Sequence, residues 1–215
     1  METRRYPVDT QTFSKVIEGN YVYVDKTALV YKMVKSFNYV FLSRPRRFGK
    51  SLLCSTLKEY FEGNKEMFAG LQMAELEKDW VKYPVIHLDF SDNKSNDIDS
   101  IKESISAKLD EYEKFFNITD ILKGFGFRFS NIITAANKIS GQKAVVIIDE
   151  YDAIMLNAIG NDKLYNQICA MMTDLLSPLK QLDPYLRFVF ITGTTTFPQM
   201  TFSLVLNNIC NISLK

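Results

Sequence analysis

Four short apolar runs, separated by longer segments, are the feature of this sequence that most limits the folds it can adopt. They span residues 39–43, 84–90, 144–148 and 186–191. The run 144–148 is apolar at every position, which is typical of a strand covered on both faces of a parallel sheet. The sequence therefore predicts a sheet whose strands are distributed along most of the chain.

Two of the intervening segments carry apolar residues at spacings of three or four, as one face of an amphipathic helix requires. The first stripe is Ile98, Ile101, Ile105, Leu109, Tyr112 and Phe116; the second is Leu164, Ile168, Met171 or Met172, and Leu175. Strands that alternate with helices predict an α/β fold, a three-layer sandwich with a mostly parallel sheet and helices on both faces. Ligands bind such sheets at the carboxyl ends of the strands.

The first apolar run leads directly into a basic loop that ends in Gly49-Lys50-Ser51, the second half of the phosphate-binding pattern G-x-x-x-x-G-K-[ST]. Gly49 would let the backbone approach phosphate, which N–H groups at the start of the next helix would bind. Lys50 would neutralise the β- and γ-phosphates, and the Ser51 hydroxyl would be a Mg²⁺ ligand. The predicted nucleotide-binding residues are Arg46, Arg47, Phe48, Gly49, Lys50, Ser51 and Leu52.

One position departs from the general phosphate-loop pattern. Arg44 stands five residues before Gly49, where the pattern has its first glycine. A side chain at this position alters the curvature of the loop, so a basic surface turn stays open as the alternative interpretation of this segment.

The run 144–148 is followed by Asp149-Glu150, and an apolar strand that ends in two carboxylates is the Walker B pattern of an ATPase. Asp149 would hold Mg²⁺ through a water molecule or jointly with Ser51, and Glu150 would orient and polarise an attacking water. The alternative is a solvated acidic turn, but the presence of both motifs favours nucleotide binding and a P-loop NTPase fold. Thr192 ends the fourth strand; it would sense the γ-phosphate, or it is an ordinary strand-end threonine.

Three arginines lie close together in the phosphate loop, at Arg44, Arg46 and Arg47. They would bind phosphate or nucleic acid, or they would pair with carboxylates across the edge of the sheet. We favour the internal pairing. The candidate partners are Asp149, Glu150 and Asp152.

Composition narrows the classes of function. With 26 Lys and Arg against 25 Asp and Glu, no global field attracts the chain to nucleic acid or to an anionic membrane. Cys54, Cys169 and Cys210 are widely separated, which argues against a disulfide framework or a zinc site and favours a cytoplasmic protein. The single histidine, His87, lies in an apolar strand, where a core residue with its hydrogen bonds satisfied is expected rather than a base. No apolar run reaches the ~18 residues of a membrane span.

Several stretches of the sequence together resemble the bacterial AAA-ATPase-like family. They are residues 23–27, 41–53, 83–90, 148–152, 192–197 and 206–209, with a loose match at 194–196. The stretch 44–51 is the most specific, and an arginine at the place of Arg44 is usual in that family. The resemblance implies a P-loop ATPase with an extra strand between the strands of the two motifs, and it implies ATP and Mg²⁺ as ligands. It also implies a C-terminal region similar to PD-(D/E)XK nucleases, beyond this chain.

We expect one main domain, since no linker or repeat divides the sequence. Residues 1–38 are predicted to pack on the core near the nucleotide site, and residues 39–215 to form the P-loop ATPase core. The segment 196–215 shows no closing helix, which predicts a core truncated at its C-terminus. The pattern Gly-Phe-Gly-Phe at 124–127 indicates a loop tip or a partner contact.

The leading interpretation is an ATPase domain that hydrolyses ATP with Mg²⁺ to drive an attached C-terminal module, with weak activity in the truncated chain. The alternative is a nucleotide-binding switch or assembly module with negligible turnover. Glu150 favours hydrolysis, because binding alone needs Asp149 but not Glu150. The chain could form a homo-oligomer, and it could bind nucleic acid, although its net charge gives no support for nucleic-acid binding. Arg128 and Arg187 are available as an arginine finger.

Overall fold

A five-stranded parallel sheet forms the centre of the computed structural model, which describes residues 4–93, 95–120, 122–195 and 209–213. The strands are β1 (Tyr39–Ser43), β2 (Val85–Asp89), β3 (Ala144–Asp149), β4 (Leu186–Gly193) and β5 (Cys210–Asn211). They pair in the order β2-β3-β4-β1-β5, and every pairing is parallel. β4 thus lies between β1 and β3, the strands that lead into the two motifs, as the family resemblance implied. Residues 196–208, which include part of that resemblance and of the predicted C-terminal truncation, lie outside the described residues.

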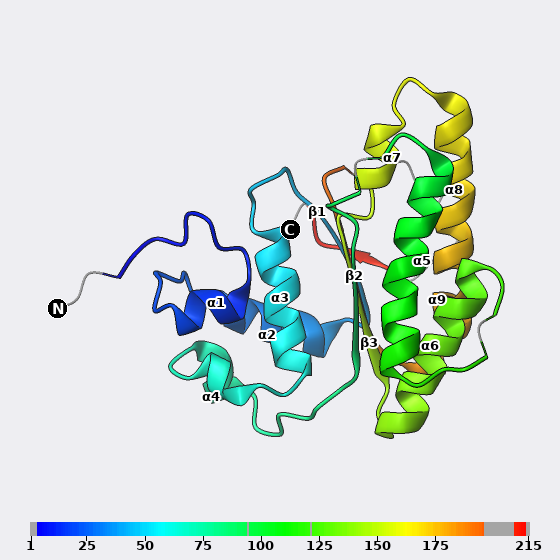
Figure 1. Ribbon diagram of the computed structural model, residues 1–215. Coiled ribbons are helices and arrows are strands. Elements are labelled where there is room, and N and C mark those ends of the chain that lie inside the picture. Colours follow the sequence, from blue (N-terminus) through cyan, green and yellow to red (C-terminus); the bar gives the residue numbers. More distant parts are fainter. Residues whose placement is uncertain (1–3, 94, 121, 196–208, 214–215) are drawn as a thin grey trace.

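Helices cover both faces of the sheet (Figure 1). One side carries α1 (Phe13–Glu18), α2 (Thr27–Ser36), α3 (Lys50–Phe61) and α4 (Gln72–Leu76). The other side carries α5 (Ile98–Phe115), α6 (Phe125–Ser140), α7 (Ala153–Asn157), α8 (Asp162–Leu176) and α9 (Pro178–Gln181). Short 3-10 turns are η1 (Lys65–Phe68) and η2 (Asp183–Tyr185). The predicted three-layer α/β sandwich is confirmed.

The strand β3 shows why the molecule has two cores, one on each side of the sheet. All six of its residues are buried. Successive side chains of a strand point to opposite faces, so Val145 and Ile147 pack with α1–α3 while Val146 and Ile148 pack with α5, α6 and α8. The part of a strand that serves two cores must be apolar at every position, which is the pattern of residues 144–148; Asp149 follows them at the end of the strand.

The start of α6 shows that the loop tip predicted at 124–127 is wrong. The helix begins at Phe125, and Gly124, with φ 89°, is its N-cap residue. A Cβ on Gly126 would come within 2.5 Å of the backbone oxygen of Asp174 on α8. The Gly126 N–H also donates to the Asp174 carboxylate, at 3.2 Å. The two glycines therefore permit a helix start and a close helix crossing rather than a turn.

Neither arginine considered for a finger role is available for it in this fold. The buried Arg128 guanidinium lies between α5 and α6, where it contacts Glu113 at 2.7 Å and also Asp110. Arg187 is the second residue of β4, at the end opposite the carboxyl edge. It donates to the backbone oxygen of Val34 at 3.3 Å. Both side chains therefore support the fold.

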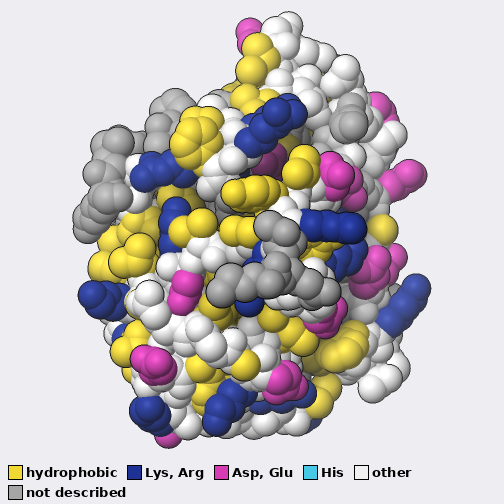
Figure 2. Space-filling view, turned by 90° about the vertical axis from the view of Figure 1, so that its left-hand side faces the viewer, with side chains coloured by type: hydrophobic (Ala, Val, Ile, Leu, Met, Phe, Trp, Pro, Cys, Tyr) yellow, Lys and Arg dark blue, Asp and Glu magenta, His cyan; other side chains and the backbone are white. Residues whose placement is uncertain are grey.

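The N-terminal segment packs against the first helix after β1. Phe13 and Val16 of α1 are buried, and the Phe13 N–H donates to Ser55 Oγ in the second turn of α3, at 2.9 Å. On this side of the molecule, basic and acidic side chains are interspersed with small hydrophobic patches (Figure 2), in keeping with the net charge of +1. Among the described helices, none is both long and apolar enough to cross a membrane.

Glu77, directly after α4, joins three elements on this side of the sheet. Its carboxylate accepts hydrogen bonds from the Tyr60 hydroxyl (2.5 Å) and the Asp79 N–H (3.1 Å), and it forms an ion pair with Lys35 (3.0 Å). Burial raises the pKa of Glu77, but the donors from Tyr60, Lys35 and Asp79 outweigh burial and hold this pKa at about 2.

This network predicts a pH-dependent stability. An unfolded Glu has a pKa of about 4.3, so the stabilisation is complete above that pH and is lost as the pH falls towards the folded value. Glu77→Gln should lower the free energy of unfolding by on the order of 2–3 kcal/mol at pH 7. The difference from wild type should shrink as the pH falls below about 4, in urea titrations over a pH series. Glu75→Gln, at an exposed position on α4, is the matched control; an equal loss in both variants would contradict the assignment.

Candidate functional site

The carboxyl ends of β1, β3 and β4 meet at one edge of the sheet. The strand register pairs Ser43 with Gly193 and Ile148 with Ile191. The loop 44–49 follows β1, and Asp149 and Glu150 stand at the end of β3. The fold therefore brings together two motifs that are far apart in the sequence.

The loop 44–49 turns tightly before α3. Arg47 (φ 68°) and Gly49 (φ 77°) both lie in the left-handed region, and Gly49 is the N-cap residue of the helix. A Cβ on Gly49 would meet nothing within 4 Å, so this position favours glycine for its backbone conformation rather than for lack of space. The loop delivers the N-terminus of a twelve-residue helix to the edge of the sheet. Free N–H groups there, together with the helix dipole, favour an anion.

The Lys50 side chain connects the loop to the acidic strand end. It is only 3% exposed, and its Nζ donates to the carbonyls of Arg44 (3.0 Å) and Pro45 (3.3 Å). The same Nζ lies 3.4 Å from Glu150 Oε1. A buried ammonium needs such partners, because unpaired burial of a charge is costly. Lys50 thus joins the two predicted motifs physically.

Glu150 has a left-handed backbone conformation, with φ 50°. Such a conformation costs a non-glycine residue on the order of 1–3 kcal/mol and is found most often at functional sites. Hydrogen bonds hold it: the Glu150 N–H donates to Thr192 Oγ1 (3.2 Å), and the Ala153 N–H donates to the Glu150 oxygen (3.0 Å). This turn places the Glu150 carboxylate beside Lys50.

Thr192 contacts both acidic residues of the strand end. Its hydroxyl donates to Asp149 Oδ1 at 2.5 Å while it accepts from the Glu150 N–H. Asp149 and Thr192 are both buried. Thr192 therefore positions the Asp149 carboxylate and the Glu150 backbone, whereas contact with a γ-phosphate stays a prediction for this residue.

Asp152 has a structural importance that the sequence analysis missed. Its fully buried carboxylate accepts hydrogen bonds from the backbone N–H groups of Thr194 and Thr195 and from the Thr195 hydroxyl. Gly193 makes this approach possible, since a Cβ there would lie 2.5 Å from the Tyr151 ring and 2.9 Å from Asp152. Asp152 thus fixes the backbone that follows β4 next to the site. The signal in the sequence is the acidic residue two positions after Glu150, together with the glycine after Thr192.

The internal pairing predicted for the loop arginines is wrong in the part of the chain that the structure describes. There, no ion pair joins Arg44, Arg46 or Arg47 to an acidic residue; Glu150 pairs instead with Lys50, and Asp152 binds backbone N–H groups. Arg46, Arg47 and Phe48 are exposed, and the Phe48 side chain is 68% exposed. These three loop residues therefore face solvent, where an incoming ligand would meet them.

The predicted Mg²⁺ ligands suit that ion in their chemistry. Ser51 lies in the first turn of α3 and is half-buried, as is Leu52 beside it. A hydroxyl and a carboxylate are oxygen donors of the type that Mg²⁺ takes in nucleotide sites. The Asp149 carboxylate is held in place by Thr192 through one oxygen, and the second oxygen is a further donor.

Comparison with known proteins decides the family. A family model described as "Predicted AAA-ATPase" matches residues 7–203, which is most of the chain. The chain belongs to the AAA-ATPase-like family. The family description suggests nucleotide binding, and the resemblance noted in the sequence is confirmed at this level.

A curated relative of this AAA-ATPase-like chain comes from Azotobacter chroococcum mcd 1 and is described as an uncharacterized protein in the vnfD 5' region. It is 33% identical over 216 residues. The match covers 100% of this chain and 42% of the relative, so the chain spans less than half the length of that protein.

The double contact of Thr192 yields a prediction for stability and metal dependence. Thr192→Val keeps the shape of the side chain but leaves Asp149 Oδ1 and the Glu150 N–H without their partner. It should lower the free energy of unfolding by about 1–3 kcal/mol and weaken Mg²⁺-dependent nucleotide binding, while Thr192→Ser should resemble wild type. Urea titration and calorimetry measure the two effects. Thr173→Val, which removes a hydroxyl bonded to the Cys169 oxygen within α8, is the control, and equal effects on nucleotide binding would refute the positioning role.

Proposed function

We propose that this domain binds ATP with Mg²⁺ and hydrolyses it. The observation that carries the proposal is the position of Lys50 Nζ, 3.4 Å from Glu150 Oε1 at the N-terminus of α3. A cation for phosphate and a carboxylate for water thus lie side by side. Asp149, held by Thr192, stands next to Glu150 in the chain and supplies the metal-binding oxygen.

Each residue of the site would have a separate role in ATP hydrolysis. The first N–H groups of α3 and the Lys50 ammonium would bind the β- and γ-phosphates, and Ser51 and Asp149 would hold the metal. Bound Mg²⁺ supplies positive charge to the phosphate oxygens. When Lys50 turns to phosphate, the Glu150 carboxylate exchanges this partner for the attacking water and orients it. The ion pair therefore sets the two groups in place for different parts of the substrate.

A nucleotide-binding switch with negligible turnover is the second candidate. Two observations favour it: the Glu150 carboxylate is already paired with Lys50, and both Arg128 and Arg187 are engaged elsewhere. An arginine that neutralises the transferred phosphoryl group contributes about 10³- to 10⁵-fold in rate. Under this candidate, the domain binds ATP, and neither Arg128 nor Arg187 takes part in turnover.

The finer parts of the proposal concern the whole protein. We propose that ATP turnover drives an attached C-terminal module similar to PD-(D/E)XK nucleases, in a cytoplasmic protein that forms homo-oligomers. The length of the relative, of which this chain spans 42%, leaves room for such a module. In such an oligomer, a second copy would be one source of an arginine for the transferred phosphoryl group.

The first test concerns phosphate binding. Lys50→Ala removes the buried cation, which should weaken ATP binding by about 2–4 kcal/mol, or roughly 30- to 1000-fold. Isothermal calorimetry with Mg-ATP measures this loss. Lys58→Ala on the same helix, where the lysine pairs with Glu62 at the surface, should bind like wild type. Equal ATP affinity in wild type and Lys50→Ala would remove the phosphate-loop assignment.

The second test separates hydrolysis from switching. Glu150→Gln keeps the size of the side chain but removes its charge, so ATP binding should persist while phosphate release slows by about 10²-fold or more. Glu62→Gln, at a half-buried position outside the site, is the control. An unchanged rate in Glu150→Gln would assign this residue to structure. ATP binding without measurable release by wild type would establish the switch.

A further inference from the structure

Behind the phosphate loop, three side chains of the kinds that bind soft metals meet from three different elements. Cys54 lies in the second turn of α3, His87 in the middle of β2 and Asp149 at the end of β3. The cysteine sulfur, an imidazole nitrogen and a carboxylate oxygen all lie within 4.8 Å of one another. The wide spacing of these residues in the sequence conceals the cluster.

His87 brings an unsatisfied nitrogen to this cluster. Its Nε2 is buried and has no hydrogen-bond partner among the residues that the structure describes, so the expectation of a fully satisfied core histidine is wrong. A buried polar atom without a partner costs free energy, and in a native protein it calls for an explanation. A bound cation would accept the lone pair of this nitrogen.

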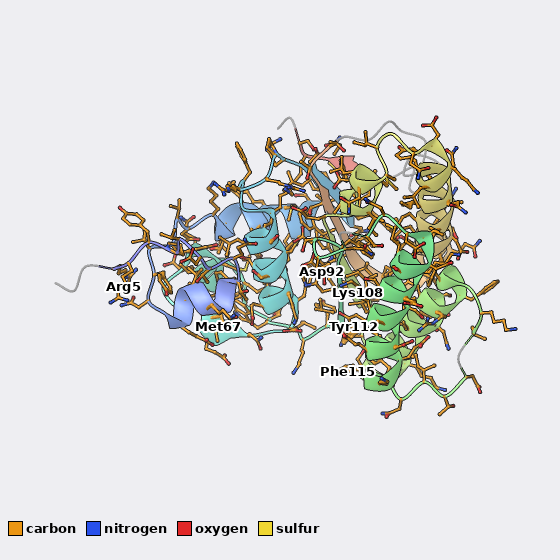
Figure 3. All side chains as sticks on the ribbon, turned by 45° about the horizontal axis from the view of Figure 1, so that its top comes forward. Arg5, Met67, Asp92, Lys108, Tyr112 and Phe115 are labelled. Carbon is orange, nitrogen blue, oxygen red and sulfur yellow. The ribbon has the colours of Figure 1, made fainter. Side chains whose placement is uncertain are left out.

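The backbone of His87 is held firmly. The Tyr112 hydroxyl donates to the His87 oxygen (2.9 Å) and accepts from the His87 N–H (2.6 Å). Tyr112 and Lys108 reach from α5 toward β2 and the residues after it, where Lys108 pairs with Asp92 at 3.3 Å (Figure 3). β2 is the edge strand of the sheet, and His87 as a whole is only partly buried.

The electrostatic surroundings suit the ligands of a metal. Burial lowers the pKa of His87, and the neutral imidazole is the form that binds a metal ion. Burial, and then the Asp149 carboxylate, raise the pKa of the Cys54 thiol. A divalent cation can bind Cys54 despite this raised pKa, since the cation displaces the proton from a coordinating thiol. Binding would therefore release one proton per ion.

We propose that Cys54, His87 and Asp149 form a buried binding site for Zn²⁺, with water as the fourth ligand. Zinc bonds of about 2.0–2.3 Å place tetrahedral ligands about 3.3–3.8 Å apart, so the three groups, which lie within 4.8 Å of one another, need to close by about 1.5 Å at most. Sulfur and imidazole donors select zinc over Mg²⁺, which takes oxygen ligands. The site is thus chemically distinct from the proposed magnesium site.

The two sites share Asp149, and this sharing has a consequence for function. A zinc ion bound to Cys54 and His87 would draw the Asp149 carboxylate away from Mg²⁺. Zinc should therefore inhibit Mg²⁺-dependent ATP hydrolysis. This consequence rests on the proposed function, whereas the zinc site itself does not.

The test uses the complete 215-residue chain without nucleotide and Co²⁺ as a spectroscopic substitute for zinc. Wild type should show a thiolate-to-cobalt charge-transfer band that one equivalent of Zn²⁺ removes. Cys54→Ala should abolish the band, and His87→Gln should weaken Co²⁺ binding by at least about tenfold. Cys169→Ala, at the half-buried cysteine of α8, should keep the band. No band in folded wild type, or a band that survives Cys54→Ala, would overturn the proposal.

His87→Gln keeps the test decisive if Cys54→Ala fails to fold, because His87 is partly exposed at the sheet edge; unchanged Co²⁺ binding in this folded variant would also overturn the site. A second experiment measures the rate of phosphate release with and without Zn²⁺. The rate of each variant with Zn²⁺ is divided by the rate of the same variant without Zn²⁺. Wild type should be inhibited and His87→Gln should not. Cobalt binding without any phosphate release would leave the metal site standing and reject hydrolysis. Phosphate release without cobalt binding would support hydrolysis and reject the metal site.

Discussion

The burial of β3 on both faces is the constraint on which the rest of the structure depends. A strand inside two cores cannot shift its register without moving every side chain to the wrong face. Its parallel neighbours are fixed in turn, so its end must project Asp149 and Glu150 beside Thr192 of β4. The chemistry of the site is therefore positioned by apolar packing a few residues away.

Buried charge and a left-handed backbone turn lie together at the edge of the sheet, where Lys50, Glu150 and Thr192 contact one another or the neighbouring loop. Lys50 pairs with Glu150 and with loop carbonyls, and the left-handed turn at Glu150 is held by the hydroxyl of Thr192. Buried polar groups in a low-dielectric region strengthen one another's interactions when all are satisfied. This explains why a single hydroxyl, on Thr192, can matter to both carboxylate residues.

The sequence predicted the strands and the two motifs because these depend on local patterns: apolar runs for the strands, and fixed spacing for Gly49-Lys50-Ser51. The sequence-based predictions were wrong where a structural feature depends on contacts between residues that are far apart in the chain. Among the described residues, the loop arginines form no ion pair with the candidate carboxylates; Glu150 pairs with Lys50, and Asp152 binds backbone N–H groups. Gly126 is predicted to be a turn residue from the sequence alone. In the fold it lies in α6, where its lack of a side chain allows α8 to approach closely. The His87 environment likewise depends on Cys54 and Asp149, which come from other elements.

Asp149 illustrates how one residue can link two kinds of chemistry. Its position at the carboxyl edge follows from the parallel sheet, and its position beside Cys54 follows from the packing of α3 on β3 and β2. The carboxylate contacts the Thr192 hydroxyl and lies close to Cys54 and His87, while the proposed magnesium site also assigns it to Mg²⁺ together with Ser51. A hard and a soft cation would compete for it at the same strand end. The packing that builds the proposed ATP site would thus also provide a means to regulate it.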